Sequence, residues 1–136
     1  MSKHESARDA GKFDVLEASK ELAGYTLRIT NNEKNFPKRY RLSVVNKLQT
    51  MAIDIAGWLV MAYELYPNNR LELDTRILYM KQARAACRSM MTLMEIAANA
   101  FGVKASTLAE WTRQAKEVRD HTTAWIMADK ERFKNL

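Results

Sequence analysis

Glycine, proline and cysteine are all scarce in this sequence of 136 residues. Four glycines and two prolines are too few for the many tight turns of a β-sandwich or a β-barrel. The single cysteine, Cys87, has no partner for an internal disulfide, which is typical of a protein from the reducing cytoplasm. These absences argue against an all-β fold and against a disulfide-stabilised secreted domain.

Long apolar runs are missing as well. No stretch approaches the roughly 18–20 apolar residues that span a bilayer, and the opening residues MSKHESARDAGK lack the apolar core of a secretory signal. The chain can still bury a core, because 47% of its residues are hydrophobic while 28% are charged. We therefore expect a soluble cytoplasmic protein that does not associate with a membrane.

Four segments carry apolar residues at spacings of three and four, the period of an amphipathic helix. They cover about residues 14–30, 36–66, 71–101 and 107–133. We predict an all-α fold in which these helices form an antiparallel up-down-up-down four-helix bundle. The bundle is expected to occupy residues 13–136 as one domain, and the polar residues 1–12 are expected to form a disordered arm.

Local signals mark several of the predicted helix ends. Pro37 suits the first turn of the second helix, where a backbone N–H is not needed. Gly102 is predicted to cap the third helix in the left-handed conformation. Thr107 and Glu110 have the spacing of a capping box at the start of the fourth helix, with Ser106 as an alternative N-cap.

Positive charge is concentrated after the first helix. Residues 1–33 carry five Lys or Arg against six Asp or Glu, whereas residues 34–136 carry 17 against 10. Residues 34–136 therefore have a net charge of +7, whereas residues 1–33 have a net charge of −1, which gives +6 for the whole chain. A basic body of this kind attracts polyanions, most often nucleic acids, by replacing the counterions of phosphates.

The sequence offers no catalytic or metal-binding constellation, so we expect no catalytic residues, no metal and no cofactor. A di-iron bundle needs Glu-x-x-His pairs, but the only histidines are His4 and His121, and Val118 stands three residues before His121. No arginine precedes either histidine at the four- to six-residue spacing of some small helical nucleases. Cys87 lies in an apolar stripe, where an inert core thiol is expected. We predict that the protein is not an enzyme.

Three groups of cations are candidate nucleic-acid contacts. They lie at the start of the second helix, on one stripe of the third and on the fourth. The last group has acidic neighbours. For it, a solvent-exposed surface without a binding role is as good an interpretation as a nucleic-acid contact. The predicted contact residues are Lys38, Arg39, Arg41 and Lys47, then Lys81, Arg84 and Arg88, and finally Arg113, Lys116 and Arg119.

Arg84 raises a separate expectation. Helical-wheel geometry places it roughly 60–70° from the apolar centre of its helix, at the edge of the core. An arginine at such a boundary needs a carboxylate or a partner subunit, because an unpaired buried charge is costly. We expect Arg84 either to pair with Asp54 or Glu95 or to line a subunit interface.

The segment FPKRYRLSVVNKLQTMAIDI, residues 36–55, resembles the start of the second helix in bacterial four-helix-bundle proteins of the accessory variability determinant type. These proteins are related to the bundle encoded in ribosomal RNA intervening sequences. Further points of resemblance, over about residues 20–133, are Tyr79 with Gln82, the segment 95–97, and the pair Trp111 and Trp125. The polar arm has no counterpart in the pattern of the family.

The resemblance implies a non-catalytic accessory protein of a diversity-generating retroelement. Such a protein forms a homopentameric ring, binds RNA and DNA with little sequence preference, and partners the reverse transcriptase in mutagenic cDNA synthesis. Two alternatives stay open: an rRNA intervening-sequence-type bundle of unknown role, and a purely structural or protein-interaction bundle. Tyr63, Tyr66 and Tyr79 are candidates for a subunit interface.

Overall fold

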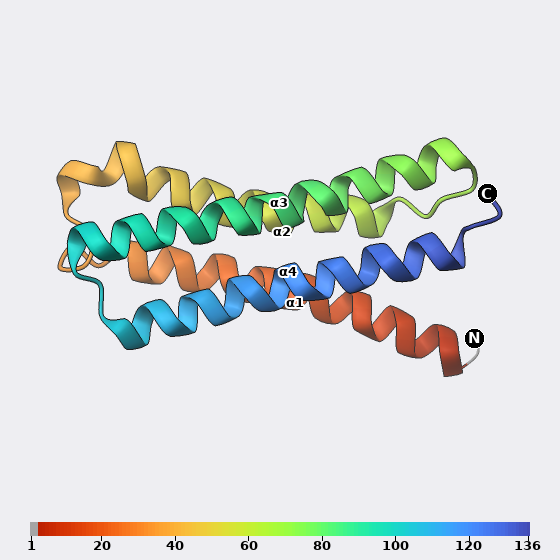
Figure 1. The fold of residues 1–136 in the computed structure, drawn as a ribbon, viewed down its shortest axis with the longest axis horizontal. Coiled ribbons are helices and arrows are strands. Elements are labelled where there is room, and N and C mark those ends of the chain that lie inside the picture. Colours follow the sequence, from red (N-terminus) through yellow and green to blue (C-terminus); the bar gives the residue numbers. More distant parts are fainter. Residues whose placement is uncertain (1–2) are drawn as a thin grey trace.

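Four long helices make up most of the molecule. The computed structural model describes the backbone of residues 3–136 and the side chains of residues 14–136. The helices are α1 (Lys3–Thr30), α2 (Asn46–Glu64), α3 (Arg70–Phe101) and α4 (Ala105–Arg132), and no strand occurs within residues 3–136. The predicted all-α class with four helices is therefore confirmed. Figure 1 shows the helices aligned along the long axis, with both chain termini at the same end of the molecule.

The predicted arm, residues 1–12, overlaps the start of α1, which begins at Lys3. Residues 1 and 2 lie outside the described residues. The division of the chain into a disordered arm and a single domain over residues 13–136 stays a prediction.

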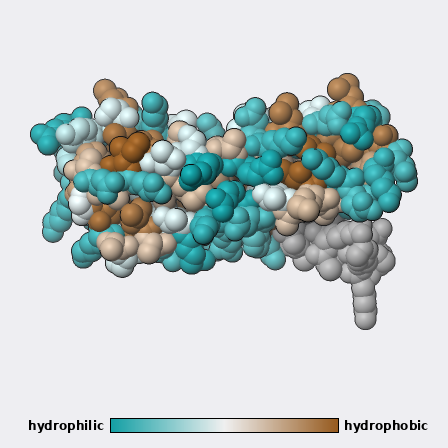
Figure 2. Space-filling view, viewed as in Figure 1, coloured by the Kyte–Doolittle hydropathy of each residue, from teal (hydrophilic) through white to brown (hydrophobic). Residues whose placement is uncertain are grey.

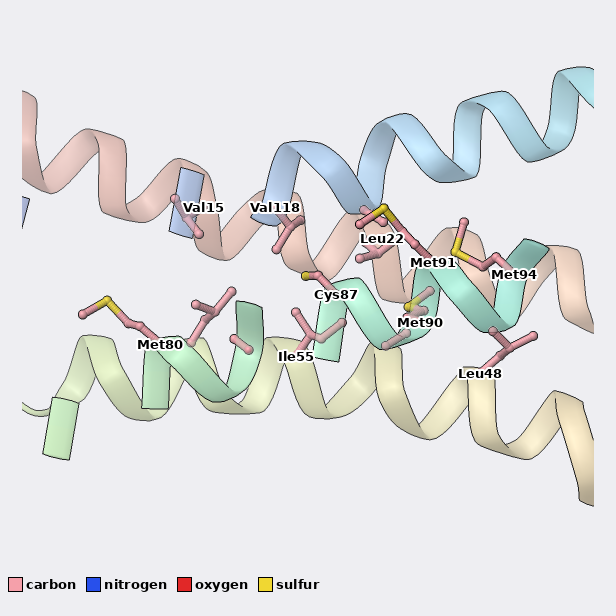
Figure 3. Close-up of a cluster of buried hydrophobic side chains, with 14 of the residues drawn as sticks. Val15, Leu22, Leu48, Ile55, Met80, Cys87, Met90, Met91, Met94 and Val118 are labelled. Atoms are coloured by element: carbon pink, nitrogen blue, oxygen red, sulfur yellow. The ribbon is translucent and has the colours of Figure 1, made fainter. Parts of the chain in front are cut away.

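Buried residues in the helices repeat at alternating spacings of three and four. This spacing allows side chains of one helix to fit between those of the next, as in coiled coils and four-helix bundles. Figure 3 shows side chains from all four helices meeting in this core, among them Leu22, Ile55, Cys87 and Val118. The inward positions are Leu48, Ala52, Ile55, Leu59 and Ala62 in α2, Leu73, Arg76, Met80, Ala83, Cys87, Met90, Met94 and Ala97 in α3, and Trp111, Ala115, Val118, Thr122, Trp125 and Asp129 in α4.

The inward face of α1 is partly polar. Ser19, Thr26 and Thr30 are buried beside Val15 and Leu22. Each hydroxyl is satisfied within its own helix, as when Thr26 donates to the carbonyl of Leu22 at 2.7 Å. The hydroxyl oxygen of Thr26 also accepts a hydrogen bond from Nε1 of Trp111 in α4 at 2.9 Å. A hydrogen bond of this kind satisfies the buried indole N–H and fixes α1 against α4.

The second helix begins differently from the prediction. Pro37 is followed by a 3-10 turn (η1, Lys38–Tyr40) and a π turn (η2, Arg41–Val45), and regular α-helix begins only at Asn46. Tertiary contacts explain the irregular start, because Phe36 is buried edge-on against Phe101 and Trp111, with ring centroids 5.8 and 6.0 Å apart. The chain must reach the core position of Val45 from this fixed aromatic anchor, and it does so through unevenly wound turns.

The helix caps confirm one prediction and correct another. Gly102 ends α3 in the left-handed conformation, with φ of 70°, as predicted. The capping box predicted at Thr107 and Glu110, with Ser106 as the alternative, is wrong, because α4 already begins at Ala105 and its N-cap, Lys104, makes no side-chain cap.

A side-chain cap stands at the start of α3 instead. The side chain of Asn69 accepts from the backbone N–H of Glu72 at 2.9 Å. The Glu72 carboxylate in turn accepts from the backbone N–H of Asn68 at 2.9 Å. These two bonds supply partners for backbone donors at the helix start, which have none inside the helix.

A buried ion pair joins α3 and α4. Nε of Arg76 donates to Oδ2 of Asp129 at 2.7 Å, and the two side chains are only 2% and 1% exposed. Arg76 also donates to the carbonyl of Leu65 at 3.2 Å, which ties the connection between α2 and α3 to this pair. Its guanidinium carbon lies 5.2 Å from the ring of Trp125. Neither partner is among the predicted site residues, where Arg84 was expected to be the boundary arginine of α3.

Candidate nucleic-acid interface

The four cations predicted before and within α2 are exposed, but an acid accompanies them. Lys38 and Arg41 lie 3.5 and 3.9 Å from the carboxylate of Glu33, which precedes the cluster in the chain. Arg39 lies over the ring of its neighbour Tyr40, at 5.0 Å from the centroid. These cations were expected at the start of an α-helix. Regular α-helix begins only at Asn46, however, and the first three cations lie in η1 and η2 before it. Lys47, on α2 itself, makes no ion pair within residues 14–136.

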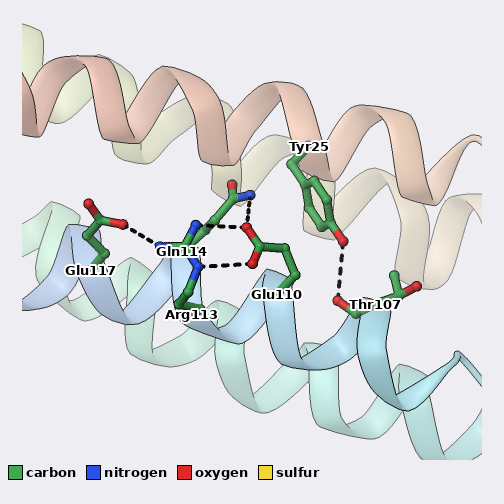
Figure 4. A network of polar contacts seen from close by, with 6 residues as sticks. All are labelled: Tyr25, Thr107, Glu110, Arg113, Gln114 and Glu117. Atoms are coloured by element: carbon green, nitrogen blue, oxygen red, sulfur yellow. Dashed lines mark hydrogen bonds and ion pairs between the residues drawn. The ribbon is translucent and has the colours of Figure 1, made fainter.

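The cations on α4 differ in how strongly acids neutralise them. Figure 4 shows Arg113 held between Glu110 and Glu117, with nitrogen–oxygen distances of 2.7 and 2.9 Å. Hydrogen bonds from Arg113 and Gln114 lower the pKa of the Glu110 carboxyl to about 2. The same contact with Glu110 raises the pKa of the Arg113 guanidinium. Arg113 is therefore a structural partner of these acids and is a poor candidate for phosphate binding.

A separate hydrogen bond joins this part of α4 to α1. The hydroxyl of Tyr25 donates to the backbone carbonyl of Thr107 at 3.4 Å. Partial burial and the charge of Glu110 raise the pKa of that phenol. Thr107, which was predicted to help cap α4, thus contacts α1 through its backbone carbonyl.

Helical spacing places the cations on α3 and the remaining cations on α4 along one interhelical line. Lys81 and Lys130 line the same groove between the two helices. Arg88 stands seven residues after Lys81, and Lys116 stands fourteen residues before Lys130. Residues separated by multiples of seven occupy equivalent positions on helices with this packing. Arg88 and Lys116 therefore continue the line that the groove begins.

Arg119 belongs to the same surface. Arg119 stands three residues after Lys116 and therefore lies on the same side of α4. Burial raises the pKa of the Cys87 thiol to about 12, and the charge of Arg119 opposes that rise. Arg84 and Arg88 flank Cys87 in the chain. We name Lys81, Arg84, Arg88, Lys116 and Arg119 the α3–α4 cationic face.

Most of the α3–α4 cationic face is free of acids. Arg119 pairs with its neighbour Asp120 at 3.1 Å. The other four members make no ion pair within residues 14–136. Their positive charge is therefore available to an anionic ligand, in contrast to that of Arg113.

Arg84 does not meet its expected carboxylate. It is half-buried, and neither Asp54 nor Glu95, both exposed, pairs with it among the described side chains. The intramolecular alternative is wrong, and a position at a subunit interface stays a prediction. The arginine that the core neutralises is Arg76, two turns earlier on α3. Arg84 lies at the flank between Ile77 and Met91, where its stem can pack while its charged end reaches solvent.

The predicted interface aromatics have different surroundings. Tyr63 and Tyr66 are exposed. Tyr79 is half-buried and stacks on Trp58 of α2, with ring centroids 5.7 Å apart. Trp111 and Trp125, which carry part of the family resemblance, are both buried and therefore stabilise the fold.

Other possible sites offer little chemistry. Cys87 is fully buried and its thiol stays protonated near neutral pH, as its pKa of about 12 requires. Within residues 14–136, no three His, Cys, Asp or Glu side chains gather closely enough to hold a metal ion. Over the same part of the chain, no helix is both long and apolar enough to cross a bilayer.

Comparison of the chain with models of known protein families, with curated proteins and with solved structures finds no match. The resemblance to the accessory variability determinant proteins therefore stays a prediction that depends on residues 36–55 above all.

Proposed function

We propose that this chain is a non-catalytic nucleic-acid-binding protein whose α3–α4 cationic face contacts phosphates. One combination of features carries the proposal: Lys81 lines the groove between α3 and α4, helical spacing places Arg84, Arg88 and Lys116 along the same line, and none of the four makes an ion pair within residues 14–136. Cations that contact phosphates provide affinity with little sequence preference. RNA and DNA, mostly without regard to sequence, are the proposed ligands.

The finer architecture and the biological setting belong to the same proposal. An antiparallel up-down-up-down bundle is compatible with the helix arrangement in Figure 1. We propose that the protein forms a homo-oligomer, a pentamer by resemblance, and assists the reverse transcriptase of a diversity-generating retroelement in the cytoplasm. A ring of basic subunits would present several cationic faces to one strand and raise its avidity. Determination of the native mass, followed by co-purification with a reverse transcriptase encoded nearby, tests this setting.

Fluorescence anisotropy with labelled RNA and DNA tests the binding proposal. The probes are mixed-sequence single strands of about 20 nucleotides, titrated with protein at low salt. The triple variant Lys81→Gln, Arg84→Gln, Arg88→Gln should bind roughly 10- to 100-fold more weakly, because each lost phosphate contact lowers affinity several-fold at low ionic strength.

A matched triple variant controls for net charge. Lys20, Arg28 and Lys34 are exposed on α1 and the segment after it, so changing each to Gln removes the same three charges elsewhere. The control should keep nearly all of its affinity. Equal losses in both variants would show that only total charge matters, and undetectable binding by the unmodified protein would favour a structural or protein-interaction bundle.

A further inference from the structure

A groove of about 660 Å³ runs between the first part of α3 and the last part of α4. α3 lines it from Arg70 to Lys81, and Lys130 and Lys134 line the opposite side. Figure 2 shows this end of the molecule with apolar brown atoms enclosed by teal polar atoms. The groove extends beyond the α3–α4 cationic face, and only Lys81 belongs to both.

The groove has an apolar floor and an apolar edge. Leu73 and Ile77 are buried beneath it, whereas Leu78, also in its lining, is 53% exposed. Leu71 stands seven residues before Leu78 and is 75% exposed. Met127 stands three residues before Lys130 and is 67% exposed. Leu78 is therefore a large apolar side chain of the groove that remains in contact with water, and Leu71 and Met127 are exposed on the same two helices, a feature typical of protein-binding surfaces.

The charges in the lining are mostly positive. Arg70, Lys81, Lys130 and Lys134 stand against a single acid, Asp74. Asp74 pairs with Arg70 at 3.2 Å, and Lys134 pairs with Glu131 at 3.0 Å. Lys81 and Lys130, which face each other across the groove, make no ion pair within residues 14–136. An occupant of the groove should therefore carry negative charge on both sides of an apolar row.

The apolar floor and the unpaired lysines of the groove together favour a protein helix over a nucleic acid or a second copy of the chain. The leucines and the isoleucine of the lining have no group that binds a phosphate, and no aromatic ring from the described residues lines the groove for a base to stack on. A second copy of the chain would bring another +6 charge toward a positive groove. An amphipathic helix presents apolar residues along one stripe and charged residues beside it, which matches both features of the groove.

We propose that the α3–α4 groove binds an acidic amphipathic helix of a partner protein. The apolar stripe of that helix packs against Leu73, Ile77 and Leu78, and its carboxylates lie beside Lys81 and Lys130. The inference shares Lys81 with the α3–α4 cationic face, but Leu78 and Lys130 play no part in the function proposed above, so variants at these two residues test the groove separately.

The probe for the test is a synthetic, covalently stapled helical peptide of about 18 residues, which spans roughly 27 Å. Leucines occupy positions i, i+4, i+7 and i+11, glutamates occupy the flanking positions, and a fluorescein reports binding by anisotropy. One control peptide has every Glu replaced by Gln, and another has every Leu replaced by Ser. The acidic peptide should bind the unmodified protein at concentrations below about 100 μM, and both controls should bind at least about tenfold more weakly.

Protein variants locate the binding site. Leu78→Ser should weaken peptide binding about tenfold or more, the loss expected when one leucine contact is removed. Ile96→Ser is the matched control, because Ile96 is an aliphatic residue of α3, 56% exposed, and does not line the groove. Lys130→Glu should also weaken binding about tenfold at low salt, while Lys47→Glu, on α2, should leave peptide binding unchanged.

Three results would overturn the inference: no binding of the acidic peptide at that concentration, equal losses in Leu78→Ser and Ile96→Ser, or loss of oligonucleotide binding in Leu78→Ser. The last result would assign the groove to nucleic acid. Unchanged oligonucleotide binding in Leu78→Ser, together with lost peptide binding, would support the inference whatever the fate of the proposed nucleic-acid function.

Discussion

Removing one partner of the Arg76–Asp129 ion pair should destabilise the protein far more than removing both. Either single deletion leaves a charge buried without its partner, which costs about 3–5 kcal/mol in such cases. The two side chains are only 2% and 1% exposed, so the cost for a buried ion pair applies here. A domain of this size has a total unfolding free energy of about 5–15 kcal/mol, so one substitution removes a large share of it.

The perturbation is a double-mutant cycle of Arg76→Met, Asp129→Leu and the double variant. Each single variant should lose about 3–5 kcal/mol, while the double variant should lie within about 1 kcal/mol of the unmodified protein, since apolar groups can replace a buried pair. At about 4 °C per kcal/mol, the single variants should melt about 12–20 °C lower.

Urea denaturation followed by circular dichroism provides the free energies. Tryptophan fluorescence gives a local signal, because the Trp125 ring lies 5.2 Å from the guanidinium carbon of Arg76. Arg70→Met is the control: Arg70 pairs with Asp74 at 3.2 Å on the surface of the same helix, where a pair contributes about 1 kcal/mol or less. If Arg76→Met cost no more than this control, or if the two single losses simply added, the assignment of a buried electrostatic unit would be refuted.

Three further predictions concern the core and the helix ends. Thr26→Val leaves the Trp111 indole N–H buried without its acceptor and should cost about 1–3 kcal/mol in urea denaturation, whereas Thr92→Val, at an exposed position, should cost much less. Gly57→Ala should stabilise α2 by about 0.5–1 kcal/mol, because a Cβ there meets nothing within 4 Å. Gly102→Ala should destabilise by about 1–2 kcal/mol, because its φ of 70° is unfavourable for alanine; equal effects at the two glycines would contradict the backbone argument. The Cys87 thiol should not react with a disulfide reagent near neutral pH until urea unfolds the protein. Because burial raises its pKa from 9.0 to about 12, the folded state keeps a proton that the unfolded state loses, so stability should fall as pH rises through that interval. Prompt labelling of the native protein would show that the thiol is exposed.

Apolar periodicity was sufficient to predict the class of fold and the approximate extent of α3, because helix burial imposes a repeat that can be read directly from a sequence. Gly102 could be predicted for a similar reason: the left-handed cap has a strong residue preference. The start of α2 could not, because its uneven turns depend on contacts of Phe36 with Phe101 and Trp111, residues far away in the chain.

The candidate site, too, could be predicted from the sequence only in part. The spacing on α3 correctly predicted that Lys81 and Arg88 are exposed and that Arg84 lies at the edge of the core, but ion pairing depends on neighbours from other parts of the chain. Acids three residues before and four residues after Arg113 were visible in the sequence and predict its neutralisation.

The Arg76–Asp129 pair also left a signal in the sequence. Arg76 falls between Leu73 and Met80 at core spacing, and Asp129 falls between Trp125 and Phe133. Charges of opposite sign at core positions of two helices indicate a buried pair. Their alignment with each other, however, requires the three-dimensional arrangement.

The salt dependence of RNA binding tests the central claim most directly. For single strands, the logarithm of the association constant falls with the logarithm of salt concentration by about 0.7 for each phosphate neutralised. Four unpaired cations on the α3–α4 cationic face therefore predict a slope of about −3, and the Lys81→Gln, Arg84→Gln, Arg88→Gln variant should show about −1. A slope near zero for the unmodified protein, or the same slope for both proteins, would contradict phosphate binding by this face.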